Sequence, residues 1–224
     1  MNRGFFPLAV EGRRLLKKEC GSALALAAVL YYAAPFLLPV LGVLALLLTG
    51  FTLFFFREPR FLPLEPEAGV ILAPSYGTVL KTGLEDGRPV VRIFLSVLDV
   101  HAQYSPVAGA VIKTAFTGGK FAAAFRDEAA ANHRNLIELS MENGETLGIE
   151  QIAGSIARRI SCPLKAGEVL VRGGRLRLIY FGSQVAVYLP AGAEISASPG
   201  QRVFPCRSVL AKLKSAGGDH ANSA

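Results

Sequence analysis

The N-terminal quarter of the chain carries one long apolar run. Gly21–Phe56 contains no charged residue, whereas a bilayer-spanning helix needs about 20 apolar residues. Pro35 and Pro39 interrupt the run. The second part, Pro35–Phe56, is long enough to cross a bilayer by itself, and Gly21–Ala34 is short for a second crossing. We therefore expect a hydrophobic helical membrane anchor at this end of the chain.

Two topologies are compatible with this anchor. In one, a helical hairpin enters the membrane and returns. In the other, a single helix crosses and the remaining chain lies outside. Residues 1–60 hold seven basic and three acidic side chains, mostly at the ends of the apolar run. Arg57 and Arg60 follow the run directly and favour the hairpin, with both basic flanks and the following domain on the cytoplasmic side. We assign residues 1–60 to the anchor.

After a proline-rich linker the pattern changes to short apolar runs separated by turn residues, which is typical of β-strands. An alanine-rich stretch, residues 121–131, is the only good helix candidate in this part. We therefore expect residues 61–224 to form a mainly β (α+β) domain. The runs that predict strands are residues 70–72, 79–80, 90–95, 109–113, 135–139 and 147–153.

Residues 164–212 contain a faint internal repeat. Residues 165–176 and 198–210 each read as a turn glycine, a short strand, a second turn and a short strand. The pattern fits ordinary β-hairpins and equally fits the barrel-sandwich arrangement of lipoyl and biotinyl carrier modules. The modified lysine motif of those carriers is not evident, so carrier function is not indicated.

Composition adds a few limits. The hydrophobic content of 51% and the mean hydropathy of +0.39 owe much to the N-terminal run. The three cysteines form no CxxC pair, which favours reduced thiols. The sequence offers no metal-ligand cluster, no phosphate-binding glycine loop and no nucleic-acid platform, so we expect neither a metal nor a nucleic-acid partner.

A Gly-Ser pair near the C-terminus offers candidate chemistry. Residues 180–190 read YFGSQVAVYLP, with Gly182 and Ser183 between two apolar runs. Glycine permits a tight turn, in which the serine hydroxyl can attack the preceding carbonyl. Elimination of the resulting ester splits the chain and leaves Ser183 as a pyruvoyl group, whose carbonyl forms a Schiff base with an amine. Taken alone the pair is usually a turn, and Gly-Ser also occurs at residues 21–22 and 154–155.

Several ordered blocks give this pair more weight. With them, the chain resembles the short-form phosphatidylserine decarboxylase proenzymes of bacteria and archaea over nearly its whole length. The blocks are residues 54–59 (FFFREP), 94–101 (FLSVLDVH), 105–109 (SPVAG), 119–121 (GKF), 134–135 (RN), 151–160 (QIAGSIARRI) and 181–190.

The resemblance implies a lyase of phospholipid biosynthesis. It implies self-cleavage between Gly182 and Ser183 into chains 1–182 and 183–224, and a pyruvoyl cofactor derived from Ser183. The enzyme would act on a phospholipid at the cell membrane and convert phosphatidylserine to phosphatidylethanolamine. His101 is the expected catalytic proton donor. Arg158 and Arg159 are candidates for binding the substrate phosphate or carboxylate, and a solvated strand end explains them as well. Homo-oligomerisation stays open.

Three departures from the family pattern concern the processing chemistry. Tyr76 stands where the family typically has an aspartate, Gln103-Tyr104 replaces Asn-Arg, and Ala186 replaces an acidic residue. A tyrosine supplies no negative charge at neutral pH, because its reference pKa is about 10. Two expectations follow: an active enzyme that uses another base, or an unprocessed, catalytically impaired membrane-bound homologue (a pseudoenzyme or lipid-binding protein). A third class, a carrier-like or efflux-adaptor domain, lacks its acceptor lysine and coiled coil.

Overall fold

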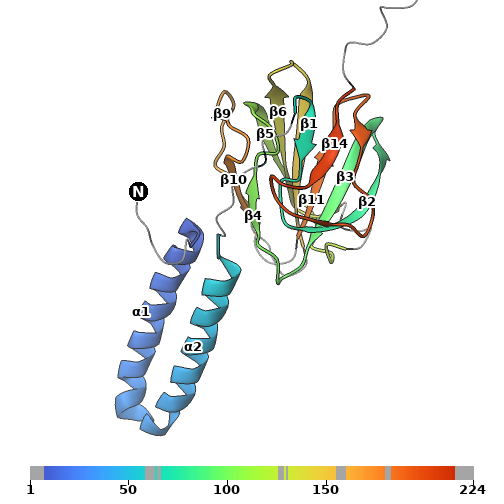
Figure 1. Ribbon diagram of the computed structural model, residues 1–224. Helices are drawn as coiled ribbons and strands as arrows, with labels where there is room; N and C mark the ends of the chain where they lie inside the picture. Colours follow the sequence, from blue (N-terminus) through green and yellow to red (C-terminus); the bar gives the residue numbers. More distant parts are fainter. Residues whose placement is uncertain are drawn as a thin grey trace, which may run out of the picture. The chain divides into compact units, whose positions relative to one another are not determined.

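The computed structural model divides the chain into two compact units, Met1–Phe61 and Leu62–Ala224 (Figure 1). The structure describes residues 8–58, 64, 67–125, 129, 131–154, 160–179 and 183–214.

Two helices and a connecting turn make up the first unit. The prolines at positions 35 and 39 both lie in first turns, where the N–H that proline lacks would have no helical partner. The interruption predicted from the two prolines is therefore the turn between the helices. The elements are α1 (Val10–Ala33), the 3₁₀ turn η1 (Pro35–Leu37) and α2 (Leu38–Phe55).

The two helices form an antiparallel hairpin. The Thr52 hydroxyl donates to Glu19 Oε1 at 2.8 Å, and the Ala9 amide donates to the Phe56 carbonyl at 3.0 Å. These contacts join the N-terminal half of α1 to the C-terminal end of α2. The segment Pro35–Phe55 is the one helix among the described residues that is long and apolar enough to cross a membrane. Such a helix is consistent with an anchor.

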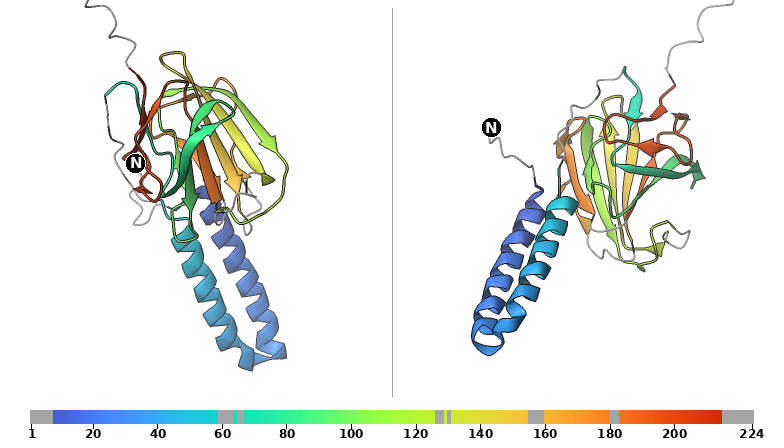
Figure 2. Two further views of the ribbon diagram at one scale, coloured as in Figure 1. Left: turned by 90° about the vertical axis from the view of Figure 1, so that its right-hand side faces the viewer. Right: turned by 60° about the horizontal axis from the view of Figure 1, so that its bottom comes forward.

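The second unit is built from three antiparallel sheets (Figures 1 and 2). The largest is a curled half-barrel with the strand order β13-β2-β3-β11-β7-β6-β5-β9. Two three-stranded sheets have the orders β1-β14-β12 and β4-β10-β8. The strands are β1 (Val70–Leu72), β2 (Gly77–Glu85), β3 (Arg88–Leu95), β4 (Ala102–Tyr104), β5 (Gly109–Thr117), β6 (Arg134–Met141), β7 (Thr146–Ala153), β8 (Ile160–Ser161), β9 (Val169–Leu170), β10 (Arg175–Ile179), β11 (Ser183–Tyr188), β12 (Glu194–Ile195), β13 (Arg202–Val203) and β14 (Val209–Lys212).

The core lies on one face of the large sheet. Alternate residues of the central strands point into it, including Ile93, Ile149, Val185 and Val187. A smaller apolar cluster that includes Ala186 lies on the reverse face. The predicted mainly β class is therefore confirmed, and each of the six predicted runs falls within a strand.

The alanine-rich helix candidate, residues 121–131, contains no α-helix among its described residues. The Asn132 side chain explains this locally. Its Oδ1 accepts from the Ala122 amide at 2.7 Å, and its Nδ2 donates to the Ala122 carbonyl at 2.8 Å. In a helix beginning at residue 121 the Ala122 amide would have no helical partner, but its carbonyl would accept from residue 126. The Asn132 bond to this carbonyl therefore competes with helix formation.

The short strands of the internal repeat form where the pattern places them, after turn glycines with positive φ at Gly167 and Gly200. Their partners are distant in sequence: β9 pairs with β5, β13 with β2, and β14 with β1 and β12. This pairing favours the sandwich-like alternative over local hairpins. The three cysteines are free thiols, as expected.

Candidate active site

Ser183 is the first residue of β11, a central strand of the large sheet. It pairs with Leu95 on one side and Ala153 on the other, and these are the last residues of β3 and β7. Three strand ends therefore meet at one edge, which we call the site edge. The neighbouring strand β2 also begins here at Gly77, where an added Cβ would clash with the Phe94 carbonyl oxygen. Only glycine lets the two strands approach so closely at this edge.

His101 lies just before β4, on the sheet that faces Ser183. The chain leaves the site edge at Leu95, passes His101 and continues through β4 to Gly109. Gly109 lies at the opposite end of the large sheet, because it pairs with Met141, the last residue of β6. His101 is therefore closer to the site edge than the rest of β4, and it is fully buried.

One hydrogen bond links the facing sheets and sets their relative level. Gln151 Nε2 in β7 donates to Gln103 Oε1 in β4 at 2.8 Å. His101 lies two residues before Gln103, toward the site edge. Ala153, the strand partner of Ser183, lies two residues after Gln151, also toward the site edge. Through this bond the segment that carries His101 lies against β7, the strand that pairs with Ser183.

The tautomer of His101 follows from its backbone contact. Its Nδ1 lies 2.9 Å from the Asp99 carbonyl oxygen, and a carbonyl only accepts, so Nδ1 carries the hydrogen. In the neutral ring Nε2 then carries the lone pair and is the basic nitrogen. The Asp99 carboxylate is engaged elsewhere: it accepts from the Ser96 amide at 2.8 Å and forms an ion pair with Arg202.

A chain of three buried amides lies one pleat below Ser183. Asn135 Nδ2 donates to Gln151 Oε1 at 3.0 Å, and Gln151 in turn donates to Gln103. We call these residues the amide chain. Its two free ends, Gln103 Nε2 and Asn135 Oδ1, have no partner among the described residues, and neither do the hydroxyls of Ser75 and Ser183.

Burying a polar atom without a hydrogen-bond partner costs free energy, so such atoms in native proteins often mark a site where a polar ligand or reacting group binds. The amide chain was not predicted from the sequence, although Asn135 and Gln151 lie in family-like blocks and Gln103 lies beside one. Isolated amides in apolar strands follow no motif, and only the fold brings the three together.

The remaining predicted site residues fall differently. Gly182, Arg158 and Arg159 lie outside the described residues. Tyr76 is half-buried in the turn before β2, and its ring stands edge-on to Phe204 with centroids 5.9 Å apart.

Two of the departures from the family pattern can be placed on the sheets. Ala186 packs on the reverse face of β11, away from the core-facing side of Ser183. Gln103 belongs to the amide chain.

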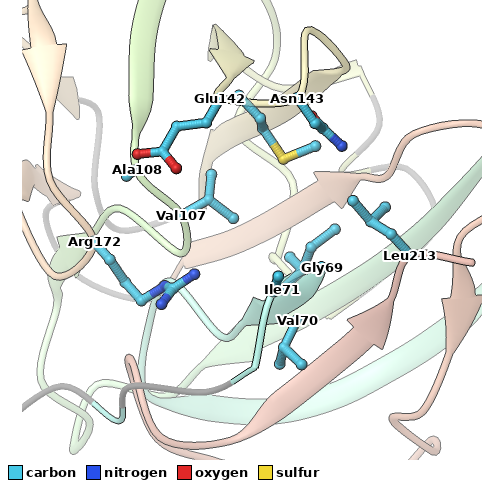
Figure 3. A pocket seen from close by; sticks show the side chains of 11 residues that line it. Gly69, Val70, Ile71, Val107, Ala108, Glu142, Asn143, Arg172 and Leu213 are labelled. Atoms are coloured by element: carbon cyan, nitrogen blue, oxygen red, sulfur yellow. The ribbon is translucent and has the colours of Figure 1, made fainter. Parts of the chain in front are cut away.

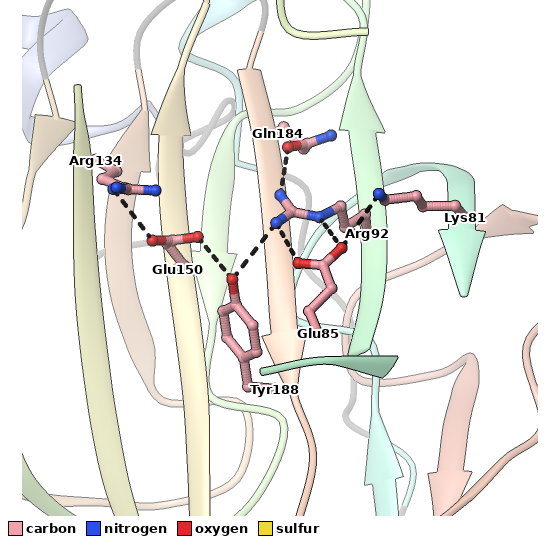
Figure 4. A network of polar contacts seen from close by, with 7 residues as sticks. All are labelled: Lys81, Glu85, Arg92, Arg134, Glu150, Gln184 and Tyr188. Carbon is pink, nitrogen blue, oxygen red and sulfur yellow. Dashed lines mark hydrogen bonds and ion pairs between the residues drawn. The ribbon is translucent and has the colours of Figure 1, made fainter. Parts of the chain in front are cut away.

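A polar network covers that reverse face (Figure 4). Arg92 donates to the two carboxylate oxygens of Glu85 at 2.8 and 2.5 Å and to Gln184 Oε1 at 2.9 Å. The Arg92 hydrogen bond lowers the pKa of Glu85. Because Gln184 follows Ser183 directly, this network holds the start of β11 in place from behind.

The network continues across the sheet through Tyr188, whose hydroxyl donates to Glu150 Oε2 at 3.1 Å. Glu150 also forms an ion pair with Arg134 at 3.6 Å. Burial, with the nearby charge of Glu150, raises the pKa of Tyr188 to about 12. Tyr188 is therefore a neutral hydrogen-bond donor at every physiological pH.

A cavity of about 170 Å³ opens at the opposite end of the sheet (Figure 3). Val107, Met141 and Arg172 help to line it. Since Met141 ends β6 at the edge away from Arg134 and Ser183, this cavity is separate from the candidate site. The described residues also contain no group of three or more His, Cys, Asp or Glu side chains able to hold a metal ion.

Sequence comparisons relate the chain to known proteins. Residues 48–211 match the family described as phosphatidylserine decarboxylase. The chain is 42% identical over 185 residues to the phosphatidylserine decarboxylase proenzyme of Gluconobacter oxydans, covering 78% of this chain and 82% of that protein. It is 41% identical over 182 residues to the proenzyme of Solidesulfovibrio magneticus, covering 78% and 84%. It is 42% identical over 170 residues to the proenzyme of Nocardia farcinica, covering 71% of each.

Proposed function

Because the chain belongs to the phosphatidylserine decarboxylase family, we propose that it cleaves itself between Gly182 and Ser183 and then decarboxylates phosphatidylserine to phosphatidylethanolamine. The observation that carries the proposal is the placement of Ser183. Its buried hydroxyl has no partner among the described residues, and the segment that carries His101, whose basic nitrogen is Nε2, is hydrogen-bonded to the neighbouring strand β7.

Self-cleavage follows from these two side chains. His101 Nε2 takes the proton of the Ser183 hydroxyl, and Oγ attacks the Gly182 carbonyl carbon. The bond between that carbon and the Ser183 nitrogen then breaks, the nitrogen takes the proton back from His101 to become a free amine, and an ester remains. Removal of the Ser183 Cα proton then expels the Gly182 carboxylate. Hydrolysis of the remaining enamine, with uptake of water and release of ammonia, leaves the pyruvoyl terminus. The Asp99 carbonyl keeps the ring in the required tautomer throughout.

The residues around Ser183 fit a pyruvoyl group in the mature enzyme. Such a group supplies a carbonyl that binds the substrate amine and withdraws electrons from the carbon that loses carbon dioxide. His101, once protonated, is placed to return a proton at that carbon. The unpaired ends of the amide chain offer one donor and one acceptor to the polar headgroup. Full burial of these side chains keeps bulk water from the reaction.

The hairpin of α1 and α2 supports an anchored enzyme. Its closure brings the charged first half of α1 beside the end of α2. The described basic residues on the two sides of the apolar run therefore lie at one end of the hairpin: Arg13, Arg14, Lys17, Lys18 and Arg57. We infer that this end faces the cytoplasm, as the distribution of positive charge favours. The acyl chains of the substrate then stay in the bilayer during the reaction.

A second candidate function is an unprocessed, lipid-binding homologue. Tyr76 favours it, because its ring packs against Phe204 and provides no carboxylate at the position where the resemblance implies one.

Intact mass of the purified full-length protein decides between the two. We expect two chains, residues 1–182 and 183–224, the smaller with a pyruvoyl terminus, and release of carbon dioxide from phosphatidylserine in mixed micelles. Ser183→Ala should remain one inactive chain, whereas Ser155→Ala, in the matched Gly154-Ser155 pair, should be cleaved normally. Decarboxylation by Ser183→Ala would refute the pyruvoyl mechanism. A single inactive wild-type chain would establish the unprocessed homologue.

A further inference from the structure

Large apolar side chains gather at the site edge and remain exposed. Leu98 is 71% exposed, Phe125 60% and Phe116 51%. All four exposed phenylalanines among the described residues of the β-rich unit lie here. We call the set the aromatic rim: Leu98, Phe116, Phe121, Phe125 and Phe204.

Strand register places each member at this edge. Leu98 lies in the turn that leaves β3 just after Leu95. Phe116 pairs with Asn135 near the start of β6, and the next two members follow β5. Phe204 directly follows Val203, which pairs with Gly77 at the start of β2. The rim therefore surrounds the same strand ends that position Ser183.

The rings are held in place although they are exposed. Phe125 stands edge-on to Phe94 at 6.0 Å, and Phe116 and Phe121 both lie against His133, with centroids 6.5 and 6.3 Å away. Lys120, also exposed, lies between them in the sequence. Phenylalanine rings with an interspersed basic group are suited to a lipid–water interface, where the rings enter the apolar layer and the cation meets lipid phosphates.

We propose that the aromatic rim inserts into the surface of a phospholipid bilayer, so that the site edge meets the lipid headgroups. The choice of a bilayer as the occupant follows from the apolar helix α2, which is able to tether the same chain to a membrane. It also rests on the proposed function, since a substrate that stays in the bilayer requires its enzyme to meet the surface at the site.

The sequence contains no tryptophan, so a single introduced tryptophan reports its own position. The full-length Phe125→Trp variant would be reconstituted in phosphatidylcholine–phosphatidylglycerol vesicles that contain lipids brominated on the acyl chains. We expect blue-shifted emission and strong quenching by the brominated lipid. The control is Leu84→Trp, at an exposed position (73%, against 60% for Phe125) in the β2–β3 hairpin at the opposite end of the sheet. Both variants keep the anchor, and we expect no quenching of the control.

Equal emission from the two variants would overturn the proposal. A second result would also overturn it: no quenching in vesicles, together with an emission blue shift in detergent that grows with protein concentration. The rim would then be a contact between two copies of the chain. In activity assays, Phe125→Ser should raise the KM for vesicle phosphatidylserine severalfold and leave kcat on a short-chain, detergent-dispersed substrate unchanged, while Leu84→Ser should change neither.

The fluorescence readout does not require a processed enzyme. Repeating it in the Ser183→Ala background should give the same quenching. An uncleaved, inactive wild type with a quenched rim would refute the proposed function and leave the rim proposal standing. A cleaved, active enzyme without quenching would refute the rim proposal alone.

Discussion

Replacing Arg92 by methionine tests whether the reverse-face network stabilises the sheet behind Ser183 (Figure 4). Methionine keeps much of the apolar stem and removes the guanidinium. The change deletes the two hydrogen bonds to Glu85 and the one to Gln184. Glu85 then loses its main cationic partner, although Lys81 remains 3.2 Å from one of its oxygens.

The expected loss follows from burial on the two sides of the pair. Breaking a fully buried ion pair by removing one partner costs about 3–5 kcal/mol. The Arg92 side chain is 9% exposed but that of Glu85 is 22% exposed, so water recovers part of the stranded carboxylate's hydration. We therefore expect the free energy of unfolding to fall by about 2–4 kcal/mol at pH 7. The double variant Arg92→Met/Glu85→Gln should lose less than the two single changes added together.

Urea unfolding of the full chain in non-ionic detergent, followed by circular dichroism at several pH values, measures this loss. Arg92 lowers the pKa of Glu85 from its reference of 4.5. The stabilisation from the ionised carboxylate is thus fully present above pH 4.5 and is lost as the pH falls through the lowered, folded-state pKa. The difference between wild type and Arg92→Met should shrink below about pH 4. A variant within about 0.5 kcal/mol of wild type at pH 7, the range of an ordinary surface change, or a difference independent of pH, would refute the reasoning.

Two further predictions concern the core-facing side. Gln151→Leu removes both hydrogen bonds of the amide chain and leaves two more buried amide atoms unsatisfied. In the same urea assay the free energy of unfolding should fall by about 2–5 kcal/mol. A loss under about 1 kcal/mol, the net contribution of one ordinary hydrogen bond, would contradict the assignment. Tyr76→Asp should shorten the half-time of self-cleavage, followed by gel after a pulse of synthesis, and an unchanged half-time would mean that the missing acid does not limit processing.

The main strands were predictable because their apolar residues are β-branched, aromatic or alternating. Residues 90–95 lie in β3, and the apolar run that follows Gly182-Ser183 forms β11; these two strands position Ser183. The pairing of β9, β13 and β14 was not predictable, since strands of two to four residues carry too little pattern to fix a distant partner. The absent helix at residues 121–131 has a similar cause: the alanines favour a helix, and one asparagine side chain outside the stretch overrides them.

The candidate site was only partly visible in the sequence. Ser183 and His101 stand out because each combines a family-like block with a side chain suited to the expected chemistry. Gln103, Gln151 and Asn135 do not, because they come from two sheets and meet only through the fold. Strand alternation does explain Ala186, since residues 183 and 186 of one strand must point to opposite faces. That departure from the family pattern therefore lies away from the proposed reaction.

The replacement of the expected acid by Tyr76 should slow self-cleavage less than the loss of the aspartate slows a serine protease. In serine proteases, changing the relay aspartate to asparagine costs about 10⁴ in rate because the histidine takes the wrong tautomer. Here the Asp99 carbonyl already holds Nδ1–H, so the tautomer of His101 does not depend on residue 76. What Tyr76 does not supply is negative charge near a protonated ring. Self-cleavage happens once per chain, so a slower step delays maturation and leaves the turnover of the mature enzyme unchanged. An active decarboxylase is therefore compatible with Tyr76.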